Sequence, residues 1–258
     1  MRAYVLVALI ALATTGPSAT MLAAQSRLPA LREGASPELR TALALWSKAL
    51  DVFAAGVESK PRHMETWFEE IDSKGAVVTR EESQLALSYV PGKEDPLTFI
   101  EYTAKDGKDV TLERRKKAAE DDAKGKPAAR RPSGEASFSA TPLDPDLQGG
   151  VTLLASRRET LNGKAVVSVD YEQVEGKSSF AGTLHLDATT GFPLEAVYGF
   201  RKAPVFVAFM RTNLVYGETL SQGRSAAVVT SVGFEAEATI LVIKKRFRGE
   251  LRFQDYAN

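Results

Sequence analysis

The sequence predicts a mainly β fold of the α+β class. We expect a curved antiparallel sheet of about 10–11 strands that forms an unclosed half-barrel under one N-terminal amphipathic helix. Three observations lead to this prediction. Apolar residues recur at helical spacing in one early segment, 39–57. From about residue 65 onward they alternate with polar residues between short turn signals. The 258 residues are 44% hydrophobic and 26% charged, which is ordinary for a globular protein with its own core.

Residues 1–24 have the pattern of a secretory signal peptide. Arg2 precedes an apolar run at 3–13, and small residues follow up to Ala24, where we expect cleavage. The apolar run is shorter than the roughly 20 residues that a membrane-spanning helix needs. We therefore expect a chain exported to the periplasm of a bacterium with two membranes, in which 25–258 form a single domain.

The covering helix is predicted from its caps and its apolar stripe. Ser36 is a good N-cap and Pro37 suits the first turn, whereas Gly56 and Pro61 mark the end. The stripe consists of Leu39, Leu43, Trp46, Leu50, Phe53 and Val57. Their steps of four and three draw one face of a helix, which we expect to lie on the sheet. A helix that binds a partner or a membrane surface is the alternative.

Strands are predicted wherever alternation is bounded by turn residues. Lys74-Gly75, Asn162-Gly163 and Thr190-Gly191 are the turn signals, and Asn-Gly is the strongest of them because both turn positions need positive φ. The predicted strands are 66–73, 76–90, 97–105, 151–159, 164–172, 178–187, 193–200, 205–215, 224–234, 237–244 and 247–256. Short connections between neighbours predict mainly antiparallel pairing.

Residues 105–142 are predicted to be a charged insert. A short helix can begin near Asp109 or Thr111, but it has almost no apolar face. The following stretch, 125–142, is rich in Lys, Pro, Ala and Ser, so we expect a mobile, solvated excursion. A basic docking arm through 114–117 is the alternative.

Candidate groups for catalysis are few. His63 is placed in a linker, while His185 and Asp187 lie two apart on one strand and therefore point side by side rather than converge. The chain has no cysteine, so it cannot be lipidated at a lipobox and has no disulfide or cysteine-based metal site. No hydrolase, phosphate-binding or dinucleotide motif occurs. We expect no enzyme activity, no metal and no cofactor. A hydrolase using scattered carboxylates is the alternative.

The charge balance also excludes some partners. The formal net charge is zero, and basic and aromatic residues interleave only in 244–253. Neither feature favours a nucleic-acid partner. What remains is apolar sheet surface, which exceeds what one helix can cover, so an unfilled hollow would suit an acyl chain. A fully packed core is the alternative. The predicted cavity residues are Trp46, Leu50 and Phe53 on the helix, with Phe180, Leu184, Leu186, Phe206 and Phe209 on the sheet.

A family resemblance agrees with this hypothesis. The segment Gly182-Thr-Leu-His-Leu-Asp187, followed by Thr190-Gly191-Phe-Pro193, resembles the strand–turn–strand of the LolA/LolB-like superfamily of periplasmic carriers. The order of signal peptide, one covering helix and long meander is also similar. The resemblance implies an unclosed β-barrel whose apolar cavity holds a lipid or the acyl chains of a lipidated protein, with a partner protein in the inner or outer membrane. The insert departs from the family pattern.

Two further functions share this fold class. One is an envelope-stress sensor of the RseB type, which passes a ligand signal to a membrane partner. The other is a structural envelope protein with a filled core.

Overall fold

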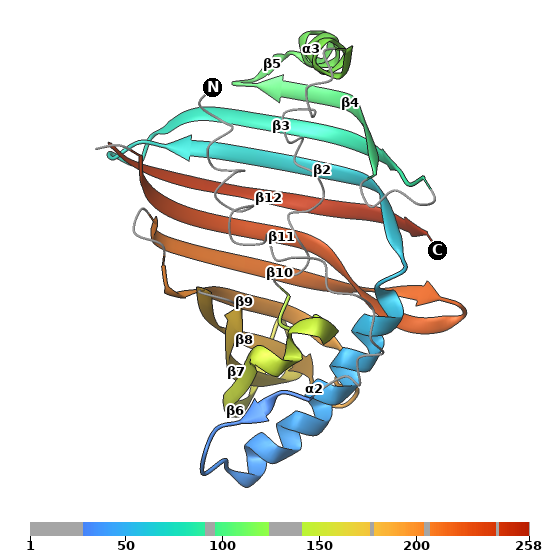
Figure 1. The fold of residues 1–258 in the computed structure, drawn as a ribbon, viewed down its shortest axis with the longest axis vertical. Helices are drawn as coiled ribbons and strands as arrows, with labels where there is room; N and C mark the ends of the chain where they lie inside the picture. Colours follow the sequence, from blue (N-terminus) through green and yellow to red (C-terminus); the bar gives the residue numbers. More distant parts are fainter. Residues whose placement is uncertain are drawn as a thin grey trace.

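The computed structural model describes residues 28–90, 96–123, 141–175, 178–203, 207–240 and 243–257. They are mainly β, with one open sheet in the order β1-β6-β7-β8-β9-β10-β11-β12-β2-β3-β4-β5. Figure 1 shows this curved sheet with the helix α2 lying across its lower strands. The predicted fold class is thereby confirmed. The predicted signal peptide, 1–24, lies outside the described residues.

The helices are α2 (Pro37–Gly56), α3 (Thr111–Ala123) and the 3-10 helix η2 (Pro145–Gly150). The strands are β1 (Ala30–Leu31), β2 (Lys60–Ile71), β3 (Val77–Ser88), β4 (Leu97–Lys105), β5 (Lys108–Asp109), β6 (Val151–Leu161), β7 (Lys164–Glu175), β8 (Ser178–Asp187), β9 (Pro193–Lys202), β10 (Val207–Ser221), β11 (Arg224–Ile240) and β12 (Ile243–Ala257).

Strands β6 to β12 follow one another as an antiparallel meander, and β12 then pairs with β2. Strands from the two ends of the chain therefore meet in the middle of the sheet. The bounds of β4 and β8 match the prediction. The predicted strand 224–234 and the first part of the predicted strand 237–244 are one strand, β11, because Glu235 and Ala236 continue the ladder opposite Arg248 and Phe247. Residues 243 and 244 of the second prediction belong to β12. His63 is not in a linker, since β2 begins at Lys60.

Helix α2 forms as its sequence predicts. The Ser36 hydroxyl accepts a hydrogen bond from the Leu39 amide at 3.2 Å, and Pro37 occupies the first turn. The helix ends at Gly56, where an added Cβ would lie 2.1 Å from the carbonyl oxygen of Ala227 on β11. Glycine is thus required for the close approach of helix and sheet. Val57, the last residue of the predicted stripe, lies beyond this end and is 48% exposed.

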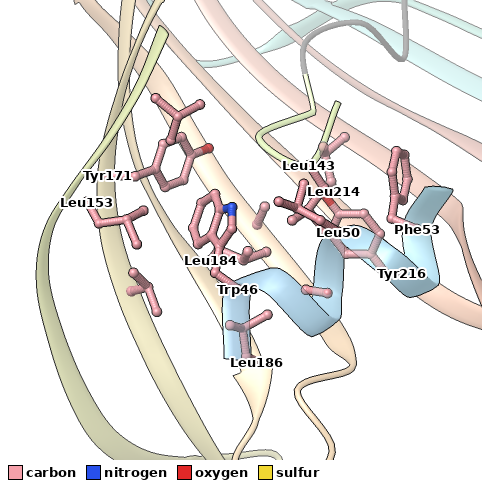
Figure 2. Packing of buried hydrophobic residues seen from close by; sticks show 14 of the residues in the cluster. Trp46, Leu50, Phe53, Leu143, Leu153, Tyr171, Leu184, Leu186, Leu214 and Tyr216 are labelled. Atoms are coloured by element: carbon pink, nitrogen blue, oxygen red, sulfur yellow. The ribbon is translucent and has the colours of Figure 1, made fainter. Parts of the chain in front are cut away.

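The main core lies between α2 and strands β6 to β11. Figure 2 shows Trp46 on the helix facing Tyr171 and Leu184 on the sheet. The Trp46 and Tyr171 rings meet edge to face at 5.6 Å, and the Trp46 indole donates to the Gln148 side chain of η2 at 3.1 Å. Trp46 and Leu184 are both 0% exposed. A second cluster consists of Met64, Leu85, Leu87 and Phe253.

The predicted insert contains an ordered helix. Helix α3 lies along the edge of β4, where the Arg115 guanidinium donates to the carbonyls of Ile100 and Glu101 at 2.8 and 3.0 Å. Arg114 pairs with Glu81 at 2.6 Å. Polar contacts to β4 and β3, rather than an apolar face, thus hold α3 in place. The rest of the insert up to residue 140 lies outside the described residues.

The two faces of the sheet differ in chemistry. We call the face that α2 covers the inner face, and the opposite one the outer face. On the outer face, Glu69 is 4% exposed and lies between Arg80 and Arg248, at 3.0 and 2.6 Å. These pairs cross β12, β2 and β3 in register, as cross-strand ion pairs do. Within the described ranges, no helix is both long enough and apolar enough to span a membrane.

Candidate functional site

The inner face carries a line of aromatic side chains that continues beyond α2. Phe180 stacks on Phe200 with ring centroids 5.0 Å apart and meets Tyr198 edge to face at 6.1 Å. Farther along the sheet, Phe68 contacts Phe247 at 5.7 Å and Phe234 at 6.3 Å. We call these residues the aromatic strip: Phe68, Phe180, Tyr198, Phe200, Phe234 and Phe247.

Strand register places the strip on one face. Tyr198 pairs with Thr212, Thr212 pairs with Phe234, and Phe234 pairs with Gly249. Gly249 in turn pairs with Phe68, so this row runs straight across five strands. Directly paired residues of antiparallel strands share a face. The row therefore lies on the same inner face as the core under α2.

Gly249 allows the two rings of this row to meet. A Cβ added at Gly249 would lie 2.7 Å from the end of the Phe234 ring and 2.6 Å from the Trp67 carbonyl oxygen. The Phe234 ring thus occupies the space above β12 that any other residue would fill. Close passage over a strand is a typical reason for an interior glycine.

Helix α2 covers only part of the inner face. It packs against β6, β7, β8, β10 and β11. Over β12, β2 and β3 no helix lies among the residues that the structure describes (Figure 1). Phe68 on β2 and Leu251 on β12 are partly exposed on this part of the face. Phe234 and Val232 on the neighbouring β11 are partly exposed too, as is Phe200 on β9. From β8 to β2 there are five strand spacings, which at about 4.8 Å each make a strip about 24 Å long.

Charged groups stand at the far end of the strip. Lys245 and Glu70 form an ion pair, and their side chains are 22% and 16% exposed. Both belong to the inner face, because Lys245 pairs with Ala238 and Glu70 pairs with Phe247. The strip is therefore an apolar row in which Phe68, Phe200 and Phe234 are partly exposed, with a partly buried ion pair at its border. Its other members, Phe180, Tyr198 and Phe247, are buried.

The structure places the predicted cavity residues in several different environments. Leu50, Phe53 and Leu186 belong to the packed core, together with Trp46 and Leu184. Phe180 alone of the predicted residues lies both in this core and in the strip. Of the remaining two, only Phe209 can be compared with the expectation, and its position differs from it. Phe209 pairs with Glu237 and is 44% exposed, whereas Phe206 lies outside the described residues.

The bulge in β10 explains the position of Phe209. The register shifts between Val207, opposite Ala238, and Phe209, opposite Glu237. Without the shift, Val207 and Phe209 would share a face, because strand residues two apart do. The extra residue reverses that alternation and directs Phe209 to the outer face. The alternation of polar and apolar residues in the sequence does not reveal where such a bulge occurs.

A polar cluster on the outer face was also not predicted. Ser168 on β7 lies between His185 on β8 and Glu159 on β6; the hydroxyl is 2.7 Å from His185 Nδ1 and also bonds the Glu159 carboxylate. That hydrogen bond lowers the pKa of Glu159. Ser168 is 0% exposed, and Glu159 approaches the same Nδ1, at 3.6 Å. In a catalytic triad the acid instead binds the other ring nitrogen. Within the described part of the chain, no group of three or more His, Cys, Asp or Glu residues is arranged to hold a metal ion.

No family model matches this chain, and no curated protein matches it in sequence. Among solved structures, MucB in complex with MucA(peri) is 11% identical over 82% of this chain and 92% of that one, with a TM-score of 0.22. The MucA/MucB complex of Pseudomonas aeruginosa is 10% identical over 83% and 94%, with a TM-score of 0.24. A DUF1329 family protein from Desulfovibrio piger is 13% identical over 82% and 92%, with a TM-score of 0.30.

Proposed function

We propose that this chain is a non-catalytic periplasmic binding protein that holds an acyl chain of a lipid or lipidated protein on the aromatic strip. The observation that carries the proposal is the continuation of the apolar inner face past α2, across β12 and β2. Phe68, Phe234 and Phe247 lie there in ring contact. A membrane partner and the family relationship stay predictions.

Binding on this strip would be reversible burial of alkyl surface. Each methylene group removed from water contributes about 0.8 kcal/mol, so a long chain gains several kcal/mol without any covalent step. An acyl chain spans about half of a hydrocarbon core that is roughly 30 Å thick. The strip of about 24 Å is long enough for one such chain.

Substitutions on the two faces of the sheet test this function. Phe234→Ser on the inner face removes ring surface from the strip, and the expected result is about tenfold weaker binding of a fluorescent fatty acid, equivalent to about 1.4 kcal/mol. Phe68→Ser should have a similar effect. Phe209→Ser is the matched control, because Phe209 lies on the outer face and is 44% exposed.

The readout is probe titration of the exported chain, with native mass spectrometry of the purified protein for lipid that co-purifies. Thermal unfolding of each variant checks that it is folded. Equal affinities for Phe234→Ser, Phe68→Ser and wild type would refute the assignment to the strip. A wild-type chain that binds no acyl probe and carries no lipid would instead indicate a structural protein.

A further inference from the structure

The inner face of β7 carries two side-chain polar atoms that are buried without a hydrogen-bond partner. Tyr171 is 1% exposed and Gln173 is 2% exposed. Neither the Tyr171 hydroxyl nor the Gln173 side-chain nitrogen has a partner. Strand residues two apart point to the same side, so both groups face the interior next to each other. Most buried polar groups in folded proteins are paired, and two neighbouring exceptions need an explanation.

Both groups lie where the aromatic strip begins. Gln173 pairs across the ladder with Phe180, the first ring of the strip. The Tyr171 hydroxyl lies above Gly182, where an added Cβ would be 3.0 Å from it. Burial, with smaller contributions from Tyr198 and Tyr216, holds the pKa of Tyr171 well above its ordinary value. The hydroxyl therefore keeps its proton and remains a donor.

We propose that Tyr171 and Gln173 form a polar subsite that binds the uncharged carbonyl of an acyl group while its chain lies along the strip. This inference rests on the proposed function and adds the chemical class of the ligand. A carbonyl oxygen has two lone pairs and can accept from both donors. An ionised carboxylate would lose its hydration at such a buried position, so an ester or a protonated acid is favoured.

The test compares probes with and without a carbonyl. Methyl palmitate and palmitic acid carry one and hexadecane does not. Their affinities are measured by displacement of a fluorescent probe from the exported chain. Tyr171→Phe and Gln173→Leu should each lower the affinity for methyl palmitate by about five- to tenfold, the loss expected for one hydrogen bond. Hexadecane should bind all proteins equally. Tyr102→Phe is the matched control, because Tyr102 is 38% exposed on the outer face.

The outcomes separate the two proposals. Weaker methyl palmitate binding supports an ester lipid as the source of the carbonyl, and an effect on palmitic acid alone supports a free fatty acid. Unchanged affinities in both variants would mean that the two groups hold water only, which overturns the subsite and leaves the acyl-binding function standing. An equal loss of affinity for hexadecane would show that Tyr171 and Gln173 contribute only packing, which would also overturn the subsite. A wild type that binds none of the three probes would overturn both proposals.

Folding of the variants is checked separately. Tyr171→Phe removes only a buried hydroxyl without a partner, so this variant should melt at or above the wild-type temperature. Thermal unfolding of Gln173→Leu checks that this variant is folded.

Discussion

Glu250 shows how a single residue on the outer face connects three strands. Its carboxylate accepts hydrogen bonds from Arg252 on its own strand, from Ser231 on β11 at 2.7 Å and from Trp67 on β2 at 3.0 Å. Its side chain is 21% exposed. Glu250 therefore joins strands from the two ends of the chain, directly behind the aromatic strip.

These contacts predict an acid-dependent loss of stability. The Arg252 guanidinium, followed by Ser231 and Trp67, lowers the pKa of Glu250 below its ordinary value of 4.5. A carboxylate with a lowered pKa in the folded state stabilises the fold above the ordinary pKa, and this contribution is lost as the pH falls through the folded value. Glu250→Gln should therefore make the free energy of unfolding depend less on pH below about 4.5.

Urea denaturation of wild type and variant at a series of acidic pH values measures this difference. Glu58→Gln is the control, because Glu58 is exposed just beyond α2. If Glu250→Gln and wild type lost stability in parallel on acidification, the contacts around Glu250 would not contribute as described.

At the scale of elements, local signals and long-range contacts differ in what they predict. The caps of α2 and the bounds of β4 and β8 could be predicted, because capping residues, turns and alternation are local. The union of two predicted strands into β11 could not, because it depends on pairing with β12. Phe68 and Phe247, which form part of the strip, are 179 positions apart (247 − 68). Alternation predicts that each faces one side, but not which residues lie beside it.

The contact between α2 and β11 makes a prediction at this scale. Alanine normally stabilises a helix relative to glycine by about 1 kcal/mol. At Gly56, however, the added Cβ would meet the Ala227 carbonyl oxygen at 2.1 Å. Gly56→Ala should therefore destabilise the protein by about 1–3 kcal/mol through overpacking, measured by urea denaturation.

Gly149→Ala in η2 is the matched control, since an added Cβ there has no atom within 4 Å. An unchanged or higher unfolding free energy for Gly56→Ala would show that α2 does not approach β11 so closely.

For the whole molecule, one helix covers one part of a long sheet and the apolar inner face continues past it. The sequence predicted this imbalance between helix and sheet, but placed the binding residues under the helix, around Trp46 and Leu184. Those residues form a packed core, because α2 lies directly on them. Strands β12 and β2 are far apart in the sequence and become neighbours only in the folded sheet. They carry the part of the inner face over which no described helix lies.

Photolabelling can locate a bound acyl chain on the sheet. A palmitate analogue with a diazirine at its methyl end is bound to the purified protein and irradiated, and the labelled residues are located by peptide mass spectrometry. With its carbonyl at β7, its methyl end should label β11, β12 and β2, at or next to Phe68, Phe234 and Phe247. Labelling confined to α2, or to outer-face residues such as Phe209, would contradict the account.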